Sequence, residues 1–248
     1  MKGFFDYLAV EEQNLLTSLV RFPKEIDMFA QLDWIYQFPM KKMTVPEEKT
    51  TIASLYLLTH YNLYFSYSCM LRSHLSDSLS AMRTGIDATF TAYRLIKKPD
   101  SIDQYLQRKH QYLRIKATIK DELKKDPSLY PLAPFLINLH EACSQYGSHA
   151  DIDSFFHRFE IVFTEIPSKI KHNVHYFQFP DNPRSYRFYL TILLKGFYTM
   201  FLIYEDFIKE YLTITEIQKW EETIRSFQDR LQLNMQVLQV NPDLPGNT

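Results

Sequence analysis

The sequence SHLSDSLSAMRTGIDATFTAYRLIK, residues 73–97, carries two helical patterns at once. Large apolar side chains recur at spacings of three and four positions, so they share one face of an α-helix. Small side chains recur at every fourth position beside them, where they allow a second helix to approach closely. The two sets are Leu75, Leu79, Met82, Ile86, Phe90 and Tyr93, and Ser76, Ser80, Thr84, Ala88 and Ala92. This stretch predicts a helix packed among other helices.

Signals that start and stop helices recur outward from this stretch in both directions. Capping boxes stand at Ser101 to Gln104 and at Thr213 to Glu216, and prolines fall between the periodic segments. We expect helices near residues 3–20, 24–37, 46–70, 73–97, 101–125, 133–146, 184–211 and 214–239. The sequence therefore predicts an all-α fold, a helical bundle of about eight helices. It forms a single domain over residues 1–240, followed by a disordered tail at 241–248.

Residues 151–180 do not fit this helical pattern. The segment VHYFQF, residues 174–179, is rich in aromatic and β-branched side chains, which favour extended structure. A helix and a short extended excursion near 169–179 both remain open for this part of the chain.

Composition excludes several classes of protein. The chain has 248 residues, of which 46% are hydrophobic, so it can bury a full core without a metal or a disulfide. Its 5 glycines lie far apart, which excludes the glycine-rich phosphate loops of P-loop and dinucleotide-binding enzymes. Its 2 cysteines form no CxxC pair. We therefore expect no cofactor.

The charge distribution and the first residues indicate a cytoplasmic protein that does not enter a membrane. The net charge is −1, and the start MKGFFD lacks the apolar core of a signal peptide. Residues 50–71 hold no formal charge, but their serines, tyrosines and His60 carry polar groups that lipid cannot satisfy. Lys195 interrupts a second apolar run, residues 188–204. We interpret both runs as helices buried inside the bundle.

The last predicted helix carries a heptad of apolar residues. Its members are Ile217, Ile224, Leu231 and Leu238. Asn234 stands three positions after Leu231, where a polar residue in a coiled-coil seam often fixes register and partner number. The seam is either the interface of a homodimer or the closing helix of the chain's own core.

The region from Arg94 to Lys125 is strongly basic, with ten lysines and arginines against four acids. Lys109, Lys116 and Lys120 share a helical stripe with apolar residues rather than with the polar face. Together with Tyr112, this stripe could hold phosphates and stack a base of RNA or single-stranded DNA. Alternatively, the lysine stems cover the core and their ammonium groups reach water.

Two further clusters deserve separate interpretations. Tyr56, His60 and Tyr64 are four residues apart and stack on one helical face, either as a buried polar cluster or as the lining of a ligand pocket. The segment from His149 to His157 holds two histidines and two aspartates, but their spacing suits one helical face poorly. A helix cap explains Asp151 or Asp153 more simply, so we expect no metal.

A resemblance adds to these observations. Residues 71–99, with the run AMRTGID, resemble the signature helix of a broad bacterial all-helical family related to abortive-infection and HEPN-like helical bundles. That family's pattern has an arginine followed four residues later by glutamate, and then a tyrosine or serine with a histidine. Arg83 matches, Asp87 stands in place of glutamate, and the run ending at His149 supplies the second element. The resemblance implies that these three side chains lie near one another in the bundle interior.

Two functions of different classes follow. The leading hypothesis is a helical-bundle protein that acts by binding or interaction, which the resemblance places in bacterial defence or stress. The alternative is a divergent nuclease or phosphate-ester hydrolase that uses Arg83, Asp87 and His149, with the lysine stripe as a phosphate clamp. The HEPN ribonuclease spacing, an arginine with a histidine five to seven residues later, is absent, which argues against RNA cleavage. Whether the protein is an enzyme stays open.

Overall fold

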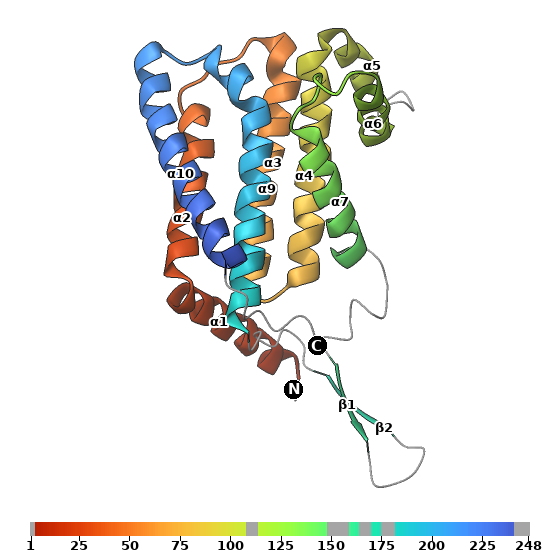
Figure 1. Cartoon of the computed structure of the whole chain (residues 1–248), viewed down its shortest axis with the longest axis vertical. Coiled ribbons are helices and arrows are strands. Elements are labelled where there is room, and N and C mark those ends of the chain that lie inside the picture. The colour runs from red at the N-terminus through yellow and green to blue at the C-terminus, as the bar shows by residue number, and fades with distance from the viewer. Residues whose placement is uncertain (1–2, 108–113, 148–158, 164–169, 175–181, 241–248) are drawn as a thin grey trace.

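The computed structural model of the chain describes residues 3–107, 114–147, 159–163, 170–174 and 182–240. These residues form a bundle of long, upright helices and a two-stranded hairpin (Figure 1). The helices are α1 (Phe4–Arg21), α2 (Pro23–Met40), α3 (Thr50–Leu71), α4 (Leu75–Lys97), α5 (Ile102–Leu106), α6 (Ile115–Lys125), α7 (Ala133–Gly147), α9 (Pro183–Lys209) and α10 (Ile214–Val240). The predicted all-α helical bundle is confirmed.

Two predicted helices differ from the observed ones at their boundaries. The helix expected at 46–70 begins at Thr50, after a 3-10 turn at Glu47–Lys49, and Pro46 before that turn has an extended backbone with ψ 161°. The helix expected at 101–125 is divided into a 3-10 turn at Pro99–Ser101, then α5, then α6. Residues 108–113, between α5 and α6, lie outside the described part of the chain.

The hairpin decides between a helix and an extended excursion, the two alternatives that the sequence left open near residues 169–179. Strand β1 (Phe159–Phe163) pairs antiparallel with β2 (Ile170–Val174), and Phe159 stands opposite Val174. The extended excursion expected near 169–179 is therefore confirmed for residues 170–174. Strand β1 was not expected, although FEIVF has the same aromatic and branched composition.

Helix α4 packs against α3, α6, α7 and α9, and its sequence pattern explains how. The predicted apolar face is buried from Leu79 to Tyr93. Of the small residues, Ala88 and Ala92 pack inside, whereas Thr84 is exposed. Close approach depends more on Gly196 of α9, where an added Cβ would overlap the methyl group of Met82 and lie 2.8 Å from Leu139. A side chain at this position would therefore require the ends of the Met82 and Leu139 side chains to move.

Buried aromatic side chains connect the helices through backbone carbonyls. Tyr36 of α2 donates a hydrogen bond to the carbonyl of Phe197 at 2.7 Å, and Tyr56 of α3 donates to the carbonyl of Tyr36 at 2.8 Å. Trp220 of α10 donates to the carbonyl of Ile35 at 2.9 Å. These bonds satisfy polar groups that would otherwise be costly to bury, and they join α2, α3, α9 and α10.

The heptad of α10 faces the chain's own core. Ile224, Leu231 and Leu238 are all less than 10% exposed, and Ile217 packs against the core from its edge. Asn234 donates a hydrogen bond to Thr191 of α9 at 2.9 Å. The seam is therefore occupied within one chain, as in the second of the two alternatives.

Helix α3 departs from the expectation of a fully buried helix. One side of it packs into the bundle, but Leu57 is 52% and Tyr61 is 61% exposed on the other side. A single row of neighbours covers only one face of a helix, and no pattern in the uncharged sequence of α3 marked the uncovered face. Among the described residues, no helix combines the length and the apolarity needed to cross a bilayer.

Candidate functional site

A cavity with a volume of about 390 Å³ lies where α4, α6 and α7 meet. These helices stand together on one flank of the bundle (Figure 1). The lining residues are Arg83, Asp87, Phe90, Thr91, Ile115, Lys116 and His140. Phe90 and Ile115 are buried and apolar, whereas the remaining lining is polar or charged. The lining is therefore mainly polar, which suits a small charged group better than a large apolar ligand.

His140 of α7 connects two charged residues of this cavity. Its side chain is only 4% exposed, and its Nε2 lies 3.0 Å from Oδ1 of Asp87 on α4. Its Nδ1 lies 2.8 Å from Nζ of Lys116 on α6. An ammonium group can only donate, so Nδ1 accepts from Lys116 and Nε2 carries the proton that Asp87 accepts. The contacts therefore select one neutral tautomer of the imidazole.

Lys116 experiences competing electrostatic influences. Burial of the ammonium group lowers the pKa of Lys116 below its ordinary value of 10.5. The carboxylates of Asp87 and Glu141 act against this, and the cations Lys120 and Arg83 reinforce it. A lysine with a lowered pKa in a cavity is a recognised sign of a functional site, although ion-pair networks also produce it.

The direct partner of Lys116 distinguishes it from its neighbours on α6. Lys120 pairs with Glu141, and Lys124 pairs with Asp121 at 3.0 Å. The close contact of Lys116 is instead a neutral imidazole nitrogen. With Arg83 and Lys116 against Asp87, the cavity lining keeps an excess of positive charge.

The structure brings together part of the site predicted from the sequence. Arg83, Asp87 and Lys116 line one cavity, and Lys120 lies one turn beyond Lys116 on α6. His149, Lys109 and Tyr112 lie outside the described residues, as do Asp151, Asp153 and His157 of the segment considered for metal binding. Within the described part of the chain, no three histidines, cysteines, aspartates or glutamates gather as a metal site would require.

Sequence reasoning missed His140, although a signal was present. The helix over 133–146 was predicted, and His140 stands in it between apolar neighbours on the face of Leu136 and Cys143. A histidine on a buried helical face needs polar partners. Those partners come from α4 and α6, 53 and 24 residues away, so local spacing could not reveal them.

The three residues predicted as a possible pocket lie in a packed polar cluster. Tyr56 is fully buried and stacks on Tyr36 with ring centroids 5.3 Å apart. His60 stacks on the same ring at 5.2 Å, and its Nε2 lies 2.7 Å from Oδ1 of Asp33. Tyr64 accepts a hydrogen bond from Gln37 at 2.7 Å. The contacts of Tyr56 and His60 are those of the buried polar cluster, one of the two alternatives, whereas Tyr64 is 40% exposed.

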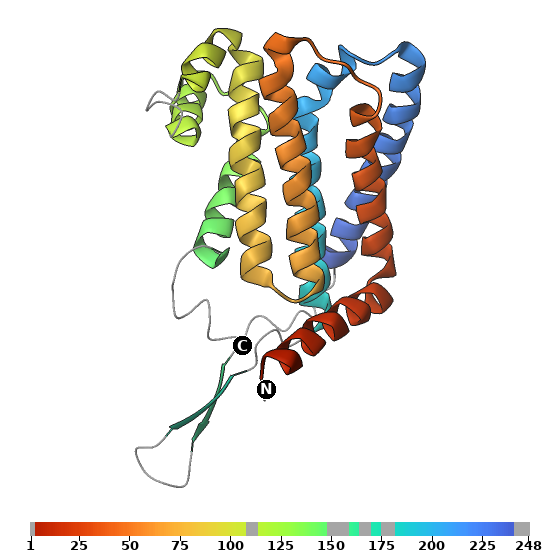
Figure 2. The ribbon, with the colours of Figure 1, turned by 180° about the vertical axis from the view of Figure 1, so that it is seen from behind.

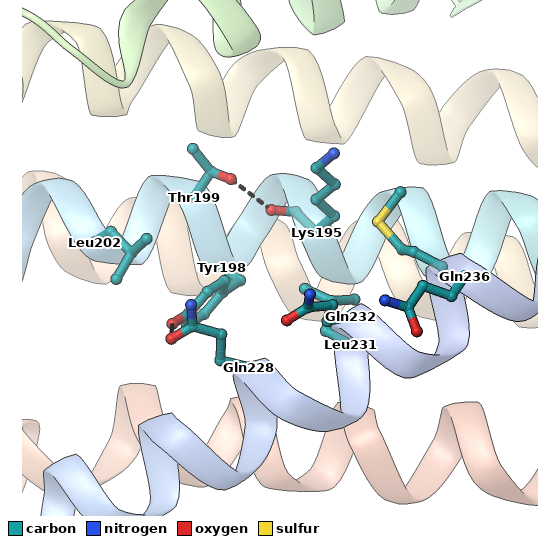
Figure 3. A pocket seen from close by; sticks show the side chains of 9 residues that line it. Lys195, Tyr198, Thr199, Leu202, Gln228, Leu231, Gln232 and Gln236 are labelled. Carbon is teal, nitrogen blue, oxygen red and sulfur yellow. Dashed lines mark hydrogen bonds between the residues drawn. The ribbon is translucent and has the colours of Figure 1, made fainter. Parts of the chain in front are cut away.

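A second cavity, of about 450 Å³, lies between α9 and α10. Figure 3 shows Gln228, Gln232 and Gln236 in a row along α10, with Tyr198 of α9 directed at Gln228. The tyrosine hydroxyl donates to Gln228 over 3.4 Å. Lys195 points away from the glutamines, with its ammonium group 4.7 Å from the ring centre of Phe135. The lining carries no carboxylate or imidazole, so it offers no acid–base pair.

Comparison with known proteins adds no functional assignment, so the interpretation of the cavities rests on their geometry. Neither a protein-family model, nor a curated protein, nor a solved structure matches the chain.

Proposed function

We propose that this protein acts by binding, and that the cavity between α4, α6 and α7 holds a phosphate group of its ligand. The observation that carries the proposal is the 2.8 Å contact between Lys116 and His140. This contact holds the Lys116 ammonium group at the cavity, and no carboxylate among the described residues bonds directly to that group. An anion is the partner that such a charge favours.

The geometry gives each cavity residue a role in holding the phosphate. A lysine ammonium group has three N–H donors, and His140 accepts one, which leaves two for phosphate oxygens. Arg83 provides a second cation on the α4 side of the cavity. Asp87 keeps Nδ1 of His140 as an acceptor and so orients Lys116 indirectly. Phe90 and Ile115 are buried behind these polar groups, so they form the floor of the cavity rather than a surface for stacking a base.

The ligand class that fits best is single-stranded nucleic acid, with RNA first. Lys120 stands one turn beyond Lys116 on α6, where the next phosphate of a strand would compete with Glu141 for its ammonium group. The resemblance of residues 71–99 to HEPN-like bundles agrees with this ligand and with a role in bacterial defence or stress.

A salt titration with two matched variants tests the proposal. Lys116→Glu and Lys124→Glu change the net charge equally and lie on the same helix, but Lys124 is 76% exposed and pairs with Asp121. Retention of a short single-stranded RNA on filters is measured against salt concentration. We expect Lys116→Glu to weaken binding about tenfold or more and Lys124→Glu to change it little. Equal effects of the two variants, or wild-type retention without salt dependence, would reject the proposal.

A second candidate function is phosphate-ester hydrolysis, favoured by the pairing of His140 with Asp87 at 3.0 Å. A carboxylate that orients an imidazole is a common arrangement for a general base. A bound phosphate that draws Lys116 away from Nδ1 would free that nitrogen to accept a proton. Hydrolysis of a nitrophenyl phosphodiester by the wild type and by His140→Gln separates the two functions. Activity that His140→Gln abolishes supports the enzyme, and activity equal in both excludes His140 as its base.

A further inference from the structure

A third cavity, of about 510 Å³, lies at the lower end of the bundle, where α2 and α9 begin and α10 ends (Figure 1). Its lining includes four cationic side chains and one carboxylate, which are Arg21, Lys24, Arg187, Arg230 and Glu25. A cavity lined mainly by one sign of charge concentrates ligands of the opposite sign. The expected occupant is therefore an anion.

Glu25 is a buried carboxylate beside this cavity. It lies on the apolar face of α2, one turn before Met28, and only 1% of its side chain is exposed. Neither of its carboxylate oxygens accepts a hydrogen bond within the described residues, and Oε1 forms an ion pair with Nε of Arg187 at 2.9 Å. A buried ion pair is weak evidence of a role in stability, because apolar side chains of similar volume stabilise a fold as well or better. The effect of Glu25 on Arg187 is the better explanation of the pair.

The Arg187 side chain is fixed at its inner end and available at its outer end. Its Nε faces Glu25, and its guanidinium carbon lies 5.9 Å from the ring centre of Phe22. Its two terminal nitrogens make no hydrogen bond with any residue that the structure describes, and the side chain is 40% exposed. A guanidinium group held in this way offers two parallel N–H donors, which match the two oxygens of a carboxylate.

The neighbouring side chains restrict the choice of ligand further. The terminal nitrogens of Arg230 already donate to Gln31 at 2.8 Å and to Asp27 at 2.6 Å, so Arg230 adds charge to the cavity but no terminal donor. The carboxylate oxygens of Glu25 are covered, so a cation that entered the cavity would meet arginine side chains first. Arg187 is therefore the direct contact that we expect for an anion.

The α10 side of the cavity is apolar. Leu233 and Val237 lie one helical turn apart on α10, and they are 62% and 58% exposed. Apolar side chains beside a few polar groups indicate a ligand that has an apolar part next to its charged group. A volume of about 510 Å³ lies within the range of small-molecule sites.

We propose that this cavity binds an organic acid that has a carboxylate at one end and an apolar chain at the other, as a medium-chain fatty acid has. The carboxylate accepts hydrogen bonds from the terminal nitrogens of Arg187. The chain lies along Leu233 and Val237. The inference does not depend on the proposed function, because Figure 2 shows α6 and α7 on one side of the bundle and α2 and α10 on the other.

Isothermal titration calorimetry of the full chain with octanoate tests the class of ligand. Octylammonium has the same chain with the opposite charge, and inorganic phosphate has negative charge without a chain. We expect octanoate to bind at one site and the other two compounds to bind at least about tenfold more weakly. Absence of octanoate binding would overturn the proposal, as would octylammonium or phosphate binding as tightly as octanoate.

Two aspartate variants test the location of the site. Leu233→Asp places a negative charge beside the bound chain and should weaken octanoate binding about tenfold or more. Leu57→Asp is the matched control, because Leu57 of α3 is 52% exposed and lies outside the lining of the cavity. Both replaced side chains are exposed, so both variants should fold. Equal octanoate affinities of the two variants would overturn the proposal.

A substitution that keeps the charge tests the contact with Arg187. Arg187→Lys leaves a cation beside Glu25, so the buried carboxylate keeps a partner, but it removes the planar pair of donors. The affinity for octanoate should fall about tenfold. Arg184→Lys is the control on the same helix, because Arg184 lies outside the lining, and it should bind octanoate as the wild type does. An affinity of Arg187→Lys equal to that of Arg184→Lys would contradict the proposed contact.

Discussion

Helices α3 and α10 are both long and regular, but they differ in the kinds of side chain that they expose to solvent. Helix α10 buries Trp220 and Phe227 completely, and none of its charged side chains is buried. Helix α3 buries one apolar side and exposes another, which includes Leu57 and Tyr61. Apolar periodicity is present in both helices. On α10 charged residues mark the solvent side, where Leu233 is exposed as well, whereas the uncharged α3 exposes a continuous row of apolar side chains.

The largest expected difference between the two helices is in stability. Trp220→Ala removes a fully buried side chain and its hydrogen bond to Ile35, so it should lower the free energy of unfolding by about 3–5 kcal/mol. Tyr61→Ala removes an exposed side chain and should change that free energy by less than about 0.5 kcal/mol. Urea denaturation followed by circular dichroism measures both. Similar losses of unfolding free energy for the two variants would contradict this expected difference.

A smaller difference is expected where the two helices begin. Thr213 accepts a hydrogen bond from the backbone N–H of Glu216, whose carboxylate bonds back to Thr213, so the predicted capping box of α10 is confirmed. Thr213→Ala should cost about 1 kcal/mol. Lys49, before α3, makes no side-chain cap, and Lys49→Ala is the matched control with little expected effect. Thermal melts of the two variants make this comparison, and a larger loss in Lys49→Ala would refute it.

The smallest expected effect is on the stability of the fold at acid pH. Burial alone would raise the pKa of Asp33, but hydrogen bonds from His60, Tyr64 and Gln37 hold it below its ordinary value of 3.8. A carboxyl group with a lowered pKa in the folded state stabilises the fold above that ordinary value. This contribution disappears as the pH falls through the lowered pKa. Asp33→Asn should therefore lose less stability than the wild type between neutral pH and about pH 3.

The control for Asp33 lies at the start of α10. Glu216 also has a lowered pKa, through hydrogen bonds with the backbone and side chain of Thr213, but it is exposed to solvent and ions. Glu216→Gln should differ from the wild type in acid mainly at low salt, because salt screens exposed charges. Urea midpoints against pH, at low and high salt, provide the measurement. An acid dependence of Asp33→Asn equal to that of the wild type would contradict the assigned role of Asp33.

The fold was predictable where local chemistry determines structure. The capping box at Thr213 and the face from Leu79 to Tyr93 both depend on neighbours along the chain. Two other local signals were wrong: Pro39, expected between helices, lies inside α2, and Ser101 makes no side-chain cap because its hydroxyl donates to the carbonyl of Lys98. The exposure of Leu57 and Tyr61 depends instead on which helices lie beside α3 in space. An uncharged helix gives no local mark of the side that stays uncovered, so the sequence favoured burial all round.

The site was predictable only in part for the same reason. Arg83 and Asp87 lie one turn apart on α4, and a resemblance within that single helix brought them to attention. His140 joins Asp87 to Lys116 across three helices, and no spacing along the chain encodes that contact. His149, the third residue that the resemblance indicated, stays a prediction.

The hydrogen bonds from buried rings to backbone carbonyls determine how far one helix can slide along another. Apolar surfaces alone tolerate sliding, because a similar set of knobs and grooves returns after about 5.4 Å, one helical turn. Tyr36, Tyr56 and Trp220 each reach one carbonyl on a neighbouring helix, so a displacement of a fraction of a turn breaks all three bonds. These side chains therefore connect α2 to α3, α9 and α10 by hydrogen bonds. The bundle therefore resists small displacements of one helix along another, which apolar contacts alone would tolerate.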